Sequence, residues 1–162
     1  MKMRRLWAGL LPLLGCLLPL AGCGGVGIDQ NEDSQPLVLL ELYPRQGEQN
    51  VPVDVQVLAV FSDAVFAADG CQAGLPQAGD FTLQLCPQGQ AASNVAAGVT
   101  CYQRRDENGQ PSGDPRLDIA VLAPNEPLQP QSRYCVSIAG TLAGANSAAL
   151  GASIESTFTT GQ

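Results

Sequence analysis

The chain has 162 residues, with 15 Asp and Glu against 8 Lys and Arg, no His and 6 Cys. The length suits one domain behind a leader, and the absence of His excludes Ser-His-Asp and Cys-His nucleophile systems and His-ligated zinc. A net charge of −7 argues against a surface that binds nucleic acid, because neutralising phosphates requires clustered Lys or Arg.

The first 22 residues have the organisation of a secretory signal. Lys2, Arg4 and Arg5 form a positive start, and an apolar run of about fifteen residues, Leu6 to Leu20, follows them. A membrane span needs about 20 apolar residues, so this run is predicted to be a cleaved signal rather than a transmembrane helix.

The signal ends in Leu20-Ala21-Gly22-Cys23, which resembles the lipobox of bacterial lipoproteins. The resemblance implies cleavage before Cys23, a diacylglycerol on its thiol and a further acyl chain, such as palmitate, on its amino group. An ordinary signal peptide whose cleavage site contains Cys is the alternative. Cys16 also follows a small and apolar stretch, Leu13-Leu14-Gly15, but cleavage there would leave a shortened apolar core.

Residues 23–36 are predicted to be the lipidated Cys and a flexible tether. Gly, polar and acidic residues dominate this stretch, and such a chain reaches about 20 Å root-mean-square. Two or more acyl chains hold a protein stably at a bilayer, so membrane attachment through Cys23 requires no transmembrane helix. In Gram-negative lipoproteins Asp after the lipidated Cys tends to retain the protein at the inner membrane. For such a source, Gly24 at this position implies the outer membrane.

From Leu37 onward the sequence is predicted to be all-β. Short apolar runs alternate with Gly, Pro, Asn and Asp, and residues such as Phe81, Leu83 and Leu85 recur with the period of two that is typical of half-buried strands. The expected strands are 37–43, 51–61, 81–86, 95–103, 116–122, 133–139 and 153–160. About seven short antiparallel strands indicate a single β-sandwich over 37–162. Asn108-Gly109 is predicted to form a hairpin turn.

Four segments, in order, resemble bacterial Ig-like domains of the type first described in surface-layer proteins. They are LYPRQGEQNVPV at 42–53, VLAVFS at 57–62, the corner from 122 to 134, and STFTTG at 156–161. The resemblance implies an Ig-like sandwich used as a spacer, structural or adhesive module without one fixed activity. It departs from the family at Gln46, where Asp or Asn usually precedes the Gly, and in its cysteines and its long 62–80 segment. Tyr134 is expected to tie its hydroxyl to the preceding corner.

Four cysteines remain after Cys23, and an exported protein is expected to join them in two disulfides. Cys86 and Cys135 are each offset by one from the inward-facing residues of their strands. In the Ig-like arrangement these strands are antiparallel neighbours, which places both cysteines at one end. The predicted pairs are therefore Cys86–Cys135 and Cys71–Cys101, and the rival is Cys71–Cys86 with Cys101–Cys135. The spacings lack a Cys-x-x-Cys clamp, so no metal is predicted.

Carboxylates are the remaining acid–base groups, and we interpret them as solvated loop charges. Asp63 and Asp69 share the long loop, whereas Asp106, Glu107 and Asp114 share a turn whose spacing does not match an EF-hand. A glycosidase would need two carboxyls about 5–10 Å apart in a cleft, usually beside aromatic platforms. No catalytic residue and no cofactor is predicted.

The sequence predicts a lipid-anchored, non-enzymatic envelope module with a structural or protein-binding role and an envelope protein as its partner. The alternative is a carbohydrate-binding or adhesion module. That alternative requires an exposed aromatic cluster around Tyr43, Tyr102 or Phe66.

Overall fold

The computed structural model describes residues 35–67, 71, 76 and 79–162. The predicted signal and Cys23 lie outside the described residues, as does the tether up to residue 34. Within the described ranges all regular structure is β. The strands are β1 (Leu39–Tyr43), β2 (Glu48–Val51), β3 (Val57–Phe61), β4 (Phe81–Leu85), β5 (Ser93–Asn94), β6 (Ala97–Tyr102), β7 (Arg116–Pro124), β8 (Arg133–Ile138) and β9 (Ile154–Thr160).

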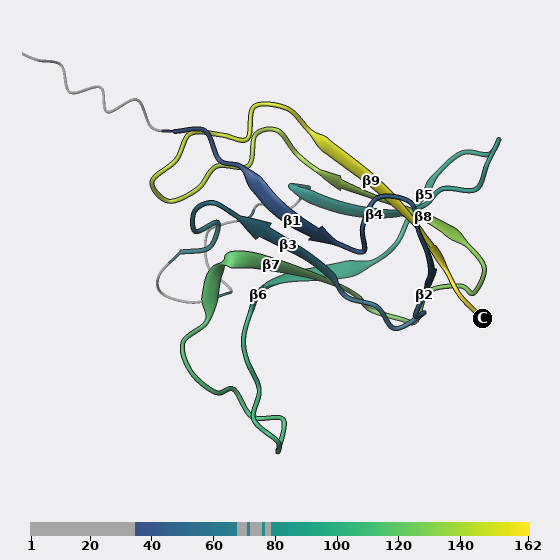
Figure 1. Cartoon of the computed structure of the whole chain (residues 1–162). Helices are drawn as coiled ribbons and strands as arrows, with labels where there is room; N and C mark the ends of the chain where they lie inside the picture. The colour runs from purple at the N-terminus through teal and green to yellow at the C-terminus, as the bar shows by residue number, and fades with distance from the viewer. Residues whose placement is uncertain (1–34, 68–70, 72–75, 77–78) are drawn as a thin grey trace, which may run out of the picture. The chain divides into compact units, whose positions relative to one another are not determined.

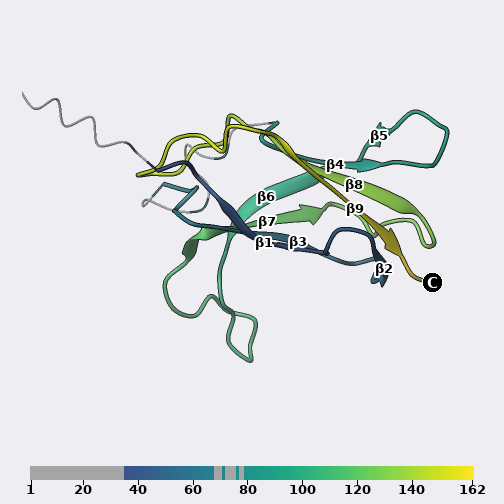
Figure 2. The same cartoon turned by 45° about the horizontal axis from the view of Figure 1, so that its top comes forward.

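The strands form two sheets that pack as a sandwich, which is the predicted fold class. One sheet has four strands in the order β1-β3-β7-β6, and the other has five in the order β2-β9-β8-β4-β5. Figures 1 and 2 show the sheets as two layers. Neighbouring strands are antiparallel except for β2 and β9, which run parallel.

The core lies between the two layers. It follows the predicted alternation on β3, β4 and β8, whereas on β7 the residues that face the core are Ala120 and Leu122. Val57, Ala59 and Phe61 of β3 are each at most 2% exposed, and the ring of Phe61 meets that of Phe81 on β4, edge to face, at 6.2 Å between centroids. This pair joins the two sheets directly. Burial of such apolar side chains is the main force that holds two sheets face to face.

The segment 51–61, predicted as one strand, is divided between the two sheets. β2 ends at Val51 beside β9, and β3 begins at Val57 beside β1 and β7. Pro52 lacks a backbone N–H, and its carbonyl accepts a hydrogen bond from Val55 N–H at 3.2 Å, which turns the chain. Val51, Val55 and Val57 remain buried through the crossing, which explains why their alternation resembled one strand.

The segment 95–103 also changes sheets, so the structure has nine described strands where about seven were predicted. β5 pairs with β4 in one sheet, and β6 pairs with β7 in the other. Val95 N–H donates to Leu83 C=O at 2.9 Å, whereas Asn125 N–H donates to Ala96 C=O at 3.0 Å. The chain therefore crosses between the layers at residues 95 and 96.

The structure contains the hairpin turn that Asn108-Gly109 predicts. Gly109 has φ of +75°, and its N–H donates to Asp106 C=O at 3.0 Å, which forms the predicted hairpin turn. The folded part begins slightly before the predicted Leu37, because Gln35 C=O accepts from Ala148 N–H and Leu37 N–H donates to Ala148 C=O, both at 3.0 Å. No helix in the described part of the chain is long and apolar enough to span a membrane.

Candidate functional site

The structure brings the four described cysteines together in the two pairs that strand parity predicts. Cys86 lies just after β4 and pairs with Cys135 on β8, with 5.9 Å between their Cα atoms. Cys86 N–H also donates to Arg133 C=O at 2.8 Å, which continues the β4–β8 ladder past the end of β4. This pair therefore lies within one sheet rather than between the sheets.

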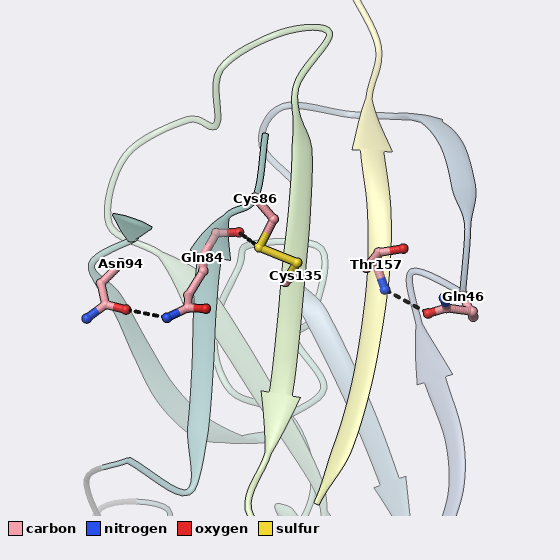
Figure 3. Close-up of a disulfide and its surroundings, with 6 residues drawn as sticks. All are labelled: Gln46, Gln84, Cys86, Asn94, Cys135 and Thr157. Carbon is pink, nitrogen blue, oxygen red and sulfur yellow. Dashed lines mark hydrogen bonds between the residues drawn. A yellow bond between two sulfur atoms is a disulfide. The ribbon is translucent and has the colours of Figure 1, made fainter. Parts of the chain in front are cut away.

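The Cys86–Cys135 pair lies on the polar outer surface of the five-stranded sheet (Figure 3). On one side Gln84 Nε2 donates to Asn94 Oδ1 at 2.8 Å, which links β4 to β5. On the other side Thr157 N–H on β9 donates to Gln46 Oε1 at 2.7 Å. The departure from the family pattern at Gln46 thus places an amide that holds the turn before β2 against β9.

Cys71 and Cys101 attach the long loop to the edge of the other sheet. Cys101 lies on the edge strand β6 and is 3% exposed, and its Cα atom is 4.9 Å from that of Cys71. Residues 68–70, 72–75 and 77–78 of this loop lie outside the described part, including the predicted loop carboxylate Asp69.

Tyr134 has the predicted role at the corner before β8. Its side chain is 2% exposed, and its hydroxyl accepts a hydrogen bond from Gln129 N–H at 2.8 Å. Its ring stacks on that of Phe158 at 5.6 Å. Thr160 completes the corner, because its hydroxyl donates to Gln129 C=O at 2.6 Å and accepts from Ser132 N–H at 3.0 Å. The hydroxyls of Tyr134 and Thr160 both bond to backbone groups of the corner, which is the structural role predicted for Tyr134.

Asp63 joins two loops that are far apart in the sequence. Its carboxylate accepts from Asn146 N–H at 2.6 Å and from Ala64 N–H at 2.8 Å. The Asn146 backbone N–H is the main cause that lowers the pKa of Asp63 below its usual 3.8, while partial burial acts in the opposite direction. A carboxylate stabilised in its charged form is a poor general acid, so this geometry favours a structural role.

The carboxylates of the hairpin also have local structural partners. Asp106 Oδ1 accepts from Asn108 N–H at 2.9 Å and Gln110 N–H at 2.8 Å, which closes the hairpin turn. Among the described residues no three metal-ligating side chains converge. Of the predicted loop carboxylates, Asp63 and Asp106 thus hold loops or turns, whereas Glu107 and Asp114 are exposed.

The aromatic residues named for a carbohydrate site do not converge. Phe66 is 2% exposed and belongs to the core. Tyr43 and Tyr102 are each 38% exposed, but they lie on β1 and β6, at opposite edges of the four-stranded sheet. These three side chains therefore do not form the exposed aromatic cluster that a carbohydrate-binding module requires.

Shallow hollows line the sandwich surface. The hollow beside β6 has a volume of about 530 Å³, and Gln56, Thr100, Tyr102, Arg105, Val121 and Ala123 line it together with the disulfide pair. A hollow of about 410 Å³ lies beside the Tyr134 corner. The sequence analysis assigned no role to either. The signal that could have directed attention to the first is the unbroken apolar run of β7, Ile119 to Ala123.

Comparison with known proteins identifies the family. A search of the curated proteins returns no match. Among solved structures, the surface layer protein SbsC, domains 1–6, superposes with a TM-score of 0.45 and 13% sequence identity over 80% of this chain. The chain spans only 14% of the length of that structure. The family model described as bacterial Ig-like domain matches residues 33–160, and the chain therefore belongs to the bacterial Ig-like domain family.

Proposed function

We propose that this protein is a lipid-anchored, non-enzymatic module of the bacterial cell envelope, with a structural or protein-binding role. The observation that carries the proposal is the order of its parts. An Ig-like sandwich matched over 33–160 follows a charged and apolar leader, a lipobox ending at Cys23 and a Gly-rich, polar stretch. This order is that of a cleaved signal, an anchor, a tether and a presented domain.

The geometry of the domain supports a presentation role. The described chain begins at Gln35 beside Ala148, and the C-terminus lies at the other end of the sandwich in both views (Figures 1 and 2). A domain held through its amino-terminal end would direct the opposite end, with the corner at 125–132, away from the membrane. The proposed partner is an envelope protein that binds the presented surface.

The anchor is tested by replacing the proposed lipidated residue. We expect mass spectrometry of the mature amino-terminal peptide to show Cys23 with a diacylglycerol and an acyl chain, and cells fed labelled palmitate to label the protein. Cys23→Ser should remove the label and release the protein from the membrane fraction. Cys16→Ser is the matched control and should change neither. An unmodified Cys23 thiol in membrane-bound protein would contradict the anchor.

The outer membrane location is tested by the residue after the anchor. In a Gram-negative host we expect the protein to sediment with outer membranes, and Gly24→Asp to shift it toward the inner membrane. Gly25→Asp adds the same charge one residue later and is the control. Wild-type protein found mainly in inner membranes would refute the outer membrane assignment while leaving the anchor intact.

A further inference from the structure

The outer face of the four-stranded sheet is unusually apolar for a surface of this molecule. In the five-stranded sheet, outward positions carry polar residues such as Thr82, Gln84 and Ser137. In the four-stranded sheet the outward residues of β3 and β7 are Leu58, Val60, Ile119 and Val121, which pair as Leu58 with Val121 and Val60 with Ile119. The first three are half-buried, and Val121 is 6% exposed. Strands that are apolar on both sides are typical of sheets covered on both faces.

The exposed apolar side chains are concentrated at one edge of this face. Leu40 is 64% exposed, Val38 46% and Tyr43 38%, and all three belong to β1 or immediately precede it. β1 contains an irregularity between Leu39 and Glu41, and such bulges oppose edge-to-edge pairing with another strand. The apolar residues are therefore suited to contact through the face rather than through the strand edge.

The opposite edge of the same face carries the hollow of about 530 Å³. The residues that line it include Val121 and Ala123 of β7, Thr100 and Tyr102 of β6, and Arg105. The strand registers place Tyr43, Leu58, Val121 and Thr100 in one row across the four strands. An exposed tyrosine at one edge and a hollow at the other thus lie at the same height along the strands.

This arrangement is self-complementary under a two-fold axis. If a second copy stacks on this face with the axis parallel to the strands, between β3 and β7, the β1 edge of each copy lies over the β6 edge of the other. Tyr43 then falls over the row position of Thr100 in the partner copy, where the hollow lies. An axis perpendicular to the strands would instead place β1 over β1 and leave both hollows empty.

We propose that the chain forms a two-fold dimer through the outer faces of its four-stranded sheets, with Tyr43 of each copy seated in the hollow over Thr100 and Val121 of the other. Isologous contacts of this kind use one patch twice, so the tyrosine and the hollow both contribute on each side. Arg105, at the side of the hollow, can stack on the incoming aromatic ring. The same axis brings Glu41, at the β1 edge, toward the edge that carries Arg105.

The dimer is tested in the full chain, expressed in a bacterial envelope, with a benzophenone amino acid in place of Tyr43. Irradiation should give a product of twice the chain mass that contains only this protein, with the link in the peptide carrying Thr100 or Val121. The same probe at Thr82, on the polar sheet, should give no such product. Absence of the product, a link elsewhere in the chain, or a product that contains a different protein would each overturn the proposal.

A second variant distinguishes a specific fit of Tyr43 into the hollow from non-specific apolar association. Thr100→Phe adds apolar area but fills the hollow, so the cross-linked product should fall by at least about fivefold, as expected when an aromatic anchor loses its pocket. Thr82→Phe makes the same change on the other sheet and should leave the product unchanged. Circular dichroism of both variants checks that the sandwich is folded. A folded Thr100→Phe protein that cross-links as well as the wild type would refute the proposed seat.

Discussion

Single side chains hold the irregular parts of this sandwich together by hydrogen-bonding to backbone groups. The Tyr134 hydroxyl, the Thr160 hydroxyl and the Asp63 carboxylate each satisfy an N–H group in a loop or at a corner. Buried or half-buried N–H groups that lose such a partner are costly, because folding has removed them from water.

Tyr134→Phe tests the corner. The substitution keeps the ring that stacks on Phe158 but leaves Gln129 N–H without its acceptor, so we expect the free energy of unfolding to fall by about 1–3 kcal/mol. Chemical denaturation of both proteins measures the change. Tyr102→Phe, at a tyrosine that is 38% exposed, is the control and should change stability by less than about 0.5 kcal/mol. Equal effects would contradict the assigned role.

Asp63→Asn tests the link between the loops and its pH dependence. The folded pKa of Asp63 is lowered, chiefly by Asn146 N–H, so its contribution is present above the ordinary pKa of 3.8 and is lost as the pH falls through the lower folded value. We expect the variant to be less stable at pH 7 by about 1 kcal/mol, reduced from the full value of a charged hydrogen bond by solvent screening. Thermal unfolding from pH 7 downward should show the two proteins converging below the ordinary pKa. A stability difference that stays constant across that pH range would contradict a role for the charge of Asp63. Asp114→Asn, at an exposed carboxylate, is the control.

Between elements, the backbone of Ala152 and Ser153 approaches Gly140, in the turn after β8, so closely that a side chain there would clash. A Cβ atom at Gly140 would lie 2.8 Å from the carbonyl carbon of Ala152 and 2.9 Å from Ser153 N, which are backbone atoms that cannot rotate away. Gly140 C=O also accepts from Gly151 N–H at 2.8 Å, so the two segments are held in contact. This turn positions β9 beside β8.

Gly140→Ala is therefore expected to destabilise the protein by about 1–3 kcal/mol, the usual cost of overpacking. Gly98→Ala on β6 is the matched control, because nothing lies within 4 Å of a Cβ at Gly98 and its φ is not positive. Differential scanning calorimetry should show a clear loss of melting temperature for the first variant and little change for the second. Similar melting temperatures would mean that the turn relaxes around the added methyl group.

At the scale of the whole molecule, the apolar core rather than a disulfide joins the two sheets. Cys86–Cys135 lies within the five-stranded sheet, and Cys71–Cys101 attaches the long loop to the edge of the four-stranded sheet. Their sequence separations are 49 and 30 residues, so each bridge restricts a large part of the unfolded chain.

Non-reducing peptide mapping of the secreted protein should return Cys71–Cys101 and Cys86–Cys135, and a Cys71–Cys86 peptide would contradict this connectivity. Replacing either pair with Ser should lower the free energy of unfolding by about 2–4 kcal/mol, with the larger loss for Cys86 and Cys135 because their loop is longer. Reduced wild-type protein, unfolded in the same denaturant series, provides the reference with both bridges absent.

Local signals in the sequence were enough to predict the fold class, the positions of most strands, the hairpin turn at Gly109 and the role of Tyr134. These features depend on local signals, namely a side-chain period of two, turn residues with positive φ and a short link from a tyrosine to its own corner. Side-chain parity, taken with the strand neighbours that the Ig-like resemblance implies, also led to the two cysteine pairs that the structure brings together.

The sheet that each strand joins, and the contacts between groups far apart in the sequence, could be read only from the folded chain. The buried alternation of Val51, Val55 and Val57 is the same whether the chain continues or crosses between layers, so alternation alone does not reveal the crossing at 52–56. Asp63 and Asn146 are 83 residues apart, and the row that joins Tyr43 to Thr100 runs through two intervening strands. Such contacts depend on how the whole chain packs. An apolar side chain can be buried by joining either sheet, whereas the hydrogen-bond partners of its strand belong to only one of them.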